Sequence, residues 1–470
     1  MQYSIVNYKT VKENSDFRID GEFYHPAILS RLNLLEGKNN EFLNNLVKFV
    51  VGPFGSTVTV DKYVDESDYR YIRNKDINDF VISDDEPALI PEKVYSPLKH
   101  FHIQKDDLLL TVVGTLGKVA IAQEKDSKSI FSCKSTLLRS QKLNPYYLLT
   151  YLNSPTGQIF SLRGKRGAIQ EGLNLTDLKD IKVFVPSSDF QNLIEILIKK
   201  SFDSANQSKS LYSQAEQLLL SELELTSWKP KHELSFIKNY SDTQEAGRFD
   251  AEYFQPKYEE IIEAARKYKG GFDELGNLVK IKDKNFTPKD DEQYKYIELA
   301  NISSNGEING YTKNLGKELP SRARRKVERD DLIISSIEGS LDSIALISDD
   351  LQNALCSTGF FVIQSKNINS ETLLILLKTK VGQLQLTRGC KGTILTAISK
   401  DELSKIVLPK IDSKIQEEIK KKITEMYKTK KLSKSLLEIA KQGVEMAIEK
   451  DEQSSEDWIK EELQKLNVKL

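Results

Sequence analysis

The segment RIDGEFYHP at residues 18–26 returns in the second half of the chain as RFDAEYFQP at residues 248–256. YRYI at residues 69–72 likewise returns as YKYI at residues 294–297, at a nearly constant offset. A nearly constant offset across separate matches indicates a duplicated unit, and internal repeats decide the architecture before any local pattern does. We therefore expect two copies of one module.

The first part of each copy reads as a mixed α/β globule. Over roughly residues 15–187 and 245–410, short β-branched and aromatic runs such as DLLLTVVG alternate with turns rich in Gly, Pro, Asn and Asp. A few stretches between these runs have a helical pattern. Strands and helices are thus expected within each globule.

The second part of each copy has the apolar period of a helix. Apolar residues recur every three or four positions over residues 188–228, and again over residues 411–450. About 36 helical residues reach ~54 Å, more than the width of a small domain, so neither apolar stripe can be covered by its own module. We expect the two helices to pack on each other, antiparallel, with the globules at opposite ends of the pair. The predicted packing residues are Phe190, Ile194, Ile198, Leu211, Ala215, Leu219, Ile415, Ile419, Ile423, Leu436 and Ala440.

Composition narrows the class of protein. The chain is 39% hydrophobic and 29% charged, as soluble globular proteins are. Its three cysteines are far apart, which excludes a disulfide framework or a CxxC metal site and indicates a reducing cytoplasm. The sequence has neither a signal peptide pattern nor an apolar run of the roughly 18 residues that a membrane span needs. Net charge is −1, so nucleic-acid binding would have to use local patches.

The sequence contains partial matches to catalytic motifs, and none of them is complete. Residues 144–147 read NPYY and lack the second Pro of the adenine methyltransferase signature Asn-Pro-Pro-Tyr, so helix capping explains them better. Residues 310–317 resemble a P-loop but have five residues between the glycines, and Glu318 follows where Ser or Thr is needed. His100 and His102 lack a third metal ligand. We expect no catalytic residue, metal or cofactor in this chain.

The strings GQIFSLRGKRGAIQEGLNLTDLKDIKVFVP at residues 157–186 and GQLQLTRGCKGTILTAISKDELSKIVLP at residues 382–409 resemble the end of a target recognition domain in the specificity subunits of type I restriction-modification systems. The resemblance extends over nearly the whole chain. It implies a non-catalytic subunit with two such domains, each reading half of a bipartite, asymmetric DNA site. It also implies two modification subunits docked on the helices, with restriction subunits beside them. S-adenosylmethionine, ATP and Mg would belong to those partners.

On this resemblance the predicted fold class is α+β, two mixed α/β target recognition domains and a pair of long antiparallel helices, related by a pseudo-two-fold repeat. The predicted domains are target recognition domain 1 (1–187), a central conserved-region helix (188–228), target recognition domain 2 (229–410), a distal conserved-region helix (411–450) and a C-terminal tail helix (451–470).

Candidate DNA contacts are basic or amide side chains in Gly-containing loops or dense clusters. Lys and Arg neutralise phosphates, and an Arg fork also reads guanine; a solvated surface is the plain alternative. The candidates are Arg163, Lys165, Arg166, Gln170, Arg322, Arg324, Arg325, Lys326, Arg388 and Lys391. Two other functions remain open, a self-contained DNA methyltransferase or nuclease and a coiled-coil scaffold. Missing cofactor motifs argue against the first, and two Gly-punctuated globules argue against the second.

Overall fold

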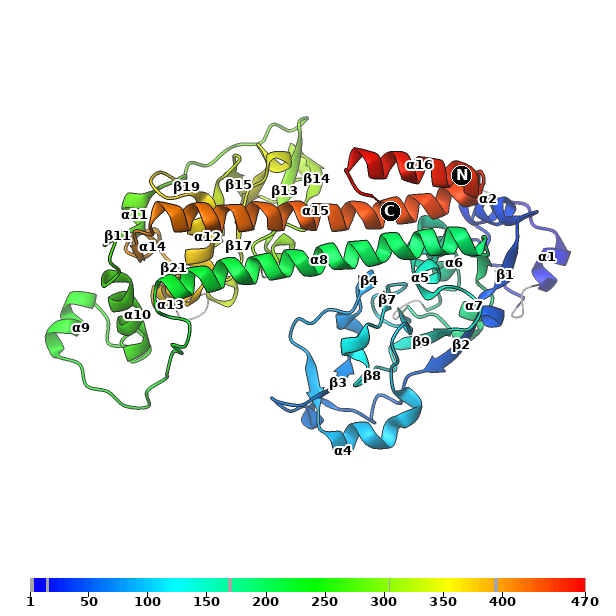
Figure 1. The fold of residues 1–470 in the computed structure, drawn as a ribbon, viewed down its shortest axis with the longest axis horizontal. Coiled ribbons are helices and arrows are strands. Elements are labelled where there is room, and N and C mark those ends of the chain that lie inside the picture. Colours follow the sequence, from blue (N-terminus) through cyan, green and yellow to red (C-terminus); the bar gives the residue numbers. More distant parts are fainter. Residues whose placement is uncertain (1–3, 14–16, 168–170, 304, 393–395, 470) are drawn as a thin grey trace. The chain divides into compact units, whose positions relative to one another are not determined.

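The computed structural model describes residues 4–13, 17–167, 171–303, 305–392 and 396–469. The chain divides into two compact units. The first unit consists of Met1–Asp203 and Leu432–Leu470, and the second of Ser204–Lys431. Helix α8 (Ser188–Glu222) begins in the first unit and ends in the second, whereas α15 (Ser413–Glu449) begins in the second and ends in the first (Figure 1). The predicted mixture of α and β structure with a long helix is confirmed.

A five-stranded sheet forms the centre of the first unit, in the order β2-β9-β6-β7-β4. These strands are Val47–Val51, Ser135–Ser140, Leu108–Thr111, Val119–Ile121 and Phe80–Val81. A second sheet has the order β5-β3-β8 (Ala88–Ile90, Tyr69–Ile72 and Ser129–Phe131), in which β3 and β8 are parallel. Strands β1 (Asn40–Phe42) and β10 (Lys182–Phe184) form an antiparallel ribbon. The helices are α1 (Tyr8–Glu13), α2 (Pro26–Leu35), α3 (Leu43–Leu46), α4 (Glu92–Tyr95), α5 (Pro145–Asn153), α6 (Pro155–Arg163), α7 (Leu175–Lys179) and α16 (Glu452–Lys465).

The second unit repeats this strand order. Its sheet β12-β19-β16-β17 (Val279–Ile281, Phe360–Ser365, Leu332–Ser335 and Ile344–Leu346) corresponds to β2-β9-β6-β7. Its other large sheet is β14-β13-β18-β15 (Thr312–Leu315, Gln293–Ile297, Leu355–Ser357 and Ala323–Lys326), with β13 and β18 parallel. Two-stranded pairs are β11 (Phe272–Glu274) with β22 (Val407–Pro409), and β20 (Cys390–Lys391) with β21 (Ala397–Ile398). The helices are α9 (Tyr240–Ala246), α10 (Pro256–Arg266), α11 (Leu275–Leu278), α12 (Ser370–Lys378), α13 (Lys380–Arg388) and α14 (Lys400–Ser404).

The two long helices pack on each other within each unit. In the first unit, Ser201 Oγ donates to the Ser433 carbonyl at 2.9 Å, and the Ser187 amide, just before α8, donates to Glu452, just after α15. In the second unit, Ser208 Oγ donates to the Met426 carbonyl at 3.0 Å. In the first unit, residue numbers increase from Ser187, just before α8, to Ser201 while those of their partners decrease from Glu452 to Ser433. The two helices therefore run antiparallel there. Of the predicted packing residues, Leu211 and Ile415 are half-buried and the others buried.

The apolar stripes of α8 and α15 enter the cores of the modules. The first core contains Phe190, Ile194 and Ile198 together with Leu436 and Ala440, and strand residues such as Leu108 belong to the same cluster. The second core contains Ala215, Leu219, Ile419 and Ile423 with Leu332. A module and the helix halves beside it therefore share one hydrophobic core, which fixes the module to the helices. None of the helices in the described ranges is long and apolar enough to cross a bilayer.

Candidate nucleic-acid interface

Arg163, at the end of α6, packs against the start of the chain. Its Nε donates to the Phe23 carbonyl at 3.0 Å, and its guanidinium lies 3.7 Å from the centroid of the Phe23 ring. The guanidinium of Arg18 lies 4.6 Å from the same ring. Burial lowers the pKa of Arg163. Arg163 and Arg18 thus hold the N-terminal segment on α6 through cation–π contacts and a hydrogen bond.

The second unit contains the same arrangement. The guanidinium groups of Arg248 and Arg388 both lie 4.4 Å from the centroid of the Tyr253 ring. Arg388 Nε donates to the Tyr253 carbonyl at 3.2 Å, and Arg248 Nη1 donates to the Cys390 carbonyl at 3.0 Å. We call these two groups the arginine–aromatic clusters: Arg18, Phe23 and Arg163 in one unit, and Arg248, Tyr253 and Arg388 in the other. They explain why the string at residues 18–26 returns at residues 248–256.

Sequence reasoning used these strings as markers of the repeat and missed the clusters. A signal was present, because an Arg and an aromatic residue keep their spacing in both copies and each copy has an Arg at the matching helix end. The prediction that Arg163 and Arg388 contact DNA stays untested, and their contacts within the protein give them a packing role.

The rest of the basic loop after α6 is paired with acids. The Arg166 guanidinium donates to Asp177 at 2.7 and 2.9 Å, and the Asp177 side chain is 6% exposed. Lys165 lies 2.6 Å from Glu171, and both side chains are well exposed. A Cβ added at Gly164 would lie 2.3 Å from the Asp177 Cβ, so packing alone accounts for this glycine. Gln170 lies outside the described residues. Exposed pairs are weak, so Lys165 remains available to a phosphate.

Four basic residues of the second unit lie on or just before an edge strand. Strand β15 pairs with β18 on one side only, and Arg322 and Lys326 are exposed while Arg324 and Arg325 are half-buried. The buried Nη1 of Arg325 has no hydrogen-bond partner among the described residues. Lys391, beyond α13, lies 3.3 Å from Glu402 and is half exposed. Of the candidates, the β15 group has the densest positive charge at the surface.

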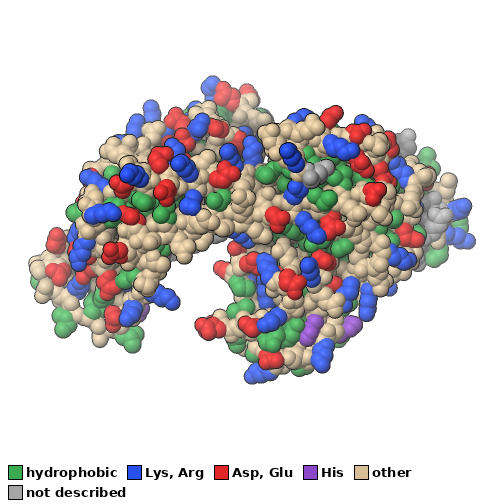
Figure 2. Space-filling model, in the orientation of Figure 1, with side chains coloured by type: hydrophobic (Ala, Val, Ile, Leu, Met, Phe, Trp, Pro, Cys, Tyr) green, Lys and Arg blue, Asp and Glu red, His purple; other side chains and the backbone are tan. Residues whose placement is uncertain are grey.

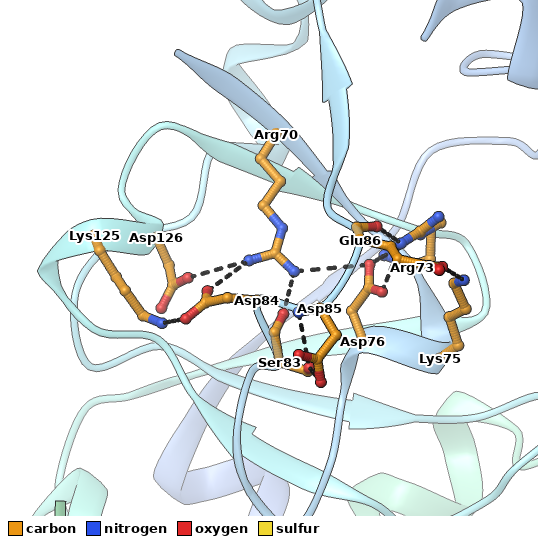
Figure 3. A network of polar contacts seen from close by, with 10 residues as sticks. All are labelled: Arg70, Arg73, Lys75, Asp76, Ser83, Asp84, Asp85, Glu86, Lys125 and Asp126. Atoms are coloured by element: carbon orange, nitrogen blue, oxygen red, sulfur yellow. Dashed lines mark hydrogen bonds and ion pairs between the residues drawn. The ribbon is translucent and has the colours of Figure 1, made fainter. Parts of the chain in front are cut away.

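Arg70 of β3 ties a loop of the first unit to its core (Figure 3). It is 9% exposed, and it donates to the Ser83 carbonyl and to Asp84, both in the connection between β4 and β5. The buried carboxylates of Asp76 and Asp126 lie 3.8 and 3.9 Å from it. Burial raises the pKa of Asp126. Acids surround this arginine, so it stiffens the connection and is poorly suited to bind phosphate.

Acidic and basic side chains intermingle on the face shown in Figure 2, in keeping with the net charge of −1. Over the described ranges, no group of three or more His, Cys, Asp or Glu side chains is placed to hold a metal ion. This face therefore presents no broad positive field in this view, and a nucleic acid would have to be held there by local contacts.

The family model described as "Type I restriction modification DNA specificity domain" matches residues 54–211. This segment is similar to a type I DNA specificity domain. It contains the sheet β5-β3-β8, the Arg70 cluster, the basic loop after α6 and most of α8. The predicted relationship to type I specificity subunits is thereby confirmed.

Segments of two type I specificity subunits align with parts of this chain. The specificity subunit of the type I restriction enzyme EcoBI from Escherichia coli is 28% identical over 136 residues, 29% of this chain and 29% of its own length. A protein named as the putative type I restriction enzyme MjaX specificity subunit, from Methanocaldococcus jannaschii, is 27% identical over 169 residues, 32% of this chain and 40% of its own length. The chain thus spans less than half the length of either relative. A solved type I S subunit from M. genitalium aligns over 87% of this chain and 95% of its own, with 13% identity and a TM-score of 0.43.

Proposed function

We propose that this chain is the DNA-sequence specificity subunit of a type I restriction-modification complex and has no catalytic activity of its own. The observation that carries this proposal is the match of residues 54–211 to a DNA specificity domain, within a unit whose strand order returns in the second unit. Each unit reads one half of a bipartite site.

The two half-sites differ in sequence. Framework strings repeat between the modules, but loops diverge: residues 52–59 read GPFGSTVT, whereas residues 282–289, close to the matching place, read KDKNFTPK. Different side chains on one frame present different hydrogen-bonding groups to base edges, so they select different bases. The recognised site is therefore asymmetric.

The partners are two modification subunits, which methylate adenine N6, and restriction subunits. Type I restriction enzymes are what the EcoBI and MjaX relatives are named for. S-adenosylmethionine, ATP and Mg are held by the partners. Residues 1–187 and 229–410 act as the two target recognition domains, at opposite ends of the paired helices and related by a pseudo-two-fold axis.

Strand β15 supplies phosphate contacts in the second module. The exposed side chains of Arg322 and Lys326 suit an incoming anion. Lys165 and Lys391, which follow the arginine–aromatic clusters, supply further contacts.

DNA binding by the chain reconstituted with its modification subunit tests this function. The plot of log affinity against log salt has a negative slope, and each lost phosphate contact makes it less steep by about one unit. Replacing Arg322 and Lys326 by Ala should therefore make the slope less steep by about two units. Lys269→Ala, at a side chain that is 76% exposed, is the matched control and should leave the slope unchanged. An equal slope in both variants would remove β15 from the interface, and a complex that never binds DNA would refute the function.

A further inference from the structure

Phe54 is an aromatic side chain that the first unit presents to solvent. It is 85% exposed, although residues on both sides of it in the loop are packed. Pro53 is buried, and Val58 belongs to a hydrophobic cluster and is 5% exposed. The Thr57 amide donates to the Phe54 carbonyl at 2.8 Å and closes a turn. Phe54 therefore lies at the tip of a loop that is anchored at both ends.

The loop is packed against the ends of two parallel strands. Strand β3 ends at Ile72 and β8 ends at Phe131, and the Ser132 amide donates to the Ile72 carbonyl at 3.0 Å. A Cβ added at Gly52 would lie 2.4 Å from the Ser132 carbonyl oxygen, so the loop backbone lies directly against this place. Phe54, two residues further on, is thus held close to the ends of β3 and β8.

An exposed cation and a second glycine-containing loop adjoin the same strand ends. Lys134 is exposed and forms no ion pair with the residues that the structure describes. Its carbonyl accepts from the amides of Val112 and Val113 at 2.9 and 3.3 Å, which joins the connection after β6 to this place. Glycines in these loops allow the backbone to approach a ligand closely. We define the Phe54 surface as residues 52–56, 112–117 and 132–134.

The second unit packs the phenylalanine of the matching connection inward. The connection from β12 to β13 corresponds to that from β2 to β3, and it contains Phe286. The Phe286 ring lies 5.9 Å from the Tyr294 ring and 5.4 Å from Lys326 Nζ. Phe54 forms no such ring contact with any residue that the structure describes. The exposed ring is therefore a feature of the first module and not of the shared frame.

A ring held out in this way suits the stack of bases in DNA. Proteins that kink DNA insert apolar side chains such as Phe between base steps, which partially unstacks them. Base–aromatic stacking tolerates any base, but the energy needed to open a step depends on its sequence. A wedge therefore selects sequence through the deformability of the duplex, and Lys134 beside it suits a phosphate of the bent strand.

We propose that Phe54 inserts between two base pairs of the half-site that the first unit reads and kinks the duplex there, with Lys134 on a nearby phosphate. This inference rests on the proposed function and deepens it. Because Phe286 is packed within its own module, the second half-site is bound without such a wedge. The kink thus adds to the asymmetry of the recognised site.

DNA bending by the full chain reconstituted with its modification subunit tests the wedge. The probe is a duplex that carries the motif found by methylation mapping, with a fluorescent donor at one end and an acceptor at the other. Phe54→Ala removes the wedge, and Phe54→Leu keeps an apolar one. Val60→Ala is the matched control, since Val60 is 75% exposed and lies outside the Phe54 surface. Unfolding in urea checks that every variant folds.

We expect energy transfer between the duplex ends to rise on binding of the wild type, the control and Phe54→Leu, and to rise less with Phe54→Ala. The affinity of Phe54→Ala for the motif should fall about tenfold. Its slope of log affinity against log salt should stay unchanged, because the ring carries no charge, whereas Lys134→Ala should make the slope less steep by about one unit.

Equal energy transfer in Phe54→Ala and the wild type, or no recovery in Phe54→Leu, would overturn the wedge. An unchanged salt slope in Lys134→Ala would overturn the phosphate contact. If Phe54→Ala instead lost the modification subunit in native mass spectrometry, Phe54 would belong to a protein contact and the wedge would be wrong. A wild-type complex that binds no DNA would refute the proposed function itself.

Discussion

Single residues that recur in both modules have a packing reason. A Cβ at Gly157 would lie 1.8 Å from the Tyr151 carbonyl oxygen, and one at Gly382 would lie 2.4 Å from the Leu377 Cα. The glutamine that follows each glycine donates to a carbonyl of the preceding helix, at 2.7 Å in the first unit and 2.9 Å in the second. The repeated GQ pair is thus required by the close approach of α5 to α6 and of α12 to α13.

Glu445 of α15 links this long helix to the first module through buried hydrogen bonds. It is 8% exposed and accepts hydrogen bonds from Ser154 Oγ at 2.7 Å and from the Thr156 amide and hydroxyl at 2.7 and 2.8 Å. Arg31 lies 3.1 Å away. Glu445→Leu removes the acceptor for the buried Ser154 and Thr156 donors, so the free energy of unfolding should fall by about 3 kcal/mol in a urea titration.

Glu449→Leu is the control for that substitution. Glu449 pairs with the same Arg31 at 2.7 Å, but its side chain is 49% exposed, so its loss should cost less than about 1 kcal/mol. Equal losses of stability in the two variants would show that burial at the start of α6 does not matter.

At the scale of elements, the helical period predicted more helix than forms. The apolar pattern predicts a helix up to residue 228, whereas α8 ends at Glu222. Glu224 has a φ of 57°, which turns the chain, and Leu225 still packs in the core of the second unit. Periodicity reports burial, and burial continues past the last helical turn.

Local sequence patterns could not predict that Arg163 packs against Phe23 within the protein. Its partner Phe23 lies 140 positions earlier, so no window of neighbouring residues contains both. The sequence also shows four basic residues within 322–326, but it does not show their place in a sheet. Only the strand pairing places β15 at the end of its sheet.

The continuity of α8 and α15 from one unit into the other leads to a prediction about spacing. Four residues inserted after Asp203 in α8 and after Lys431 in α15 add roughly 6 Å and rotate each helix by only about 40°. The preferred gap between half-sites should then grow by one or two base pairs, at about 3.4 Å each. Two-residue insertions rotate the apolar faces by about 200° and should abolish assembly.

Sequencing the sites methylated by each insertion variant checks this prediction. An unchanged gap in a fully active four-residue variant would show that the helices do not set the spacing.

At the scale of the whole molecule, the two units share one arrangement of strands and differ in their loops. The strand order and the arginine–aromatic clusters recur, while loops such as residues 52–59 do not. Because net charge is only −1, the proposed recognition of DNA would depend on local loops and not on long-range attraction.

Mapping N6-methyladenine across the genome of a host that expresses this chain with its modification subunit tests the central claim most directly. The account predicts methylation at one bipartite motif whose two halves differ in sequence, and none when this chain is omitted. A palindromic or continuous motif, or methylation that persists without the chain, would contradict it.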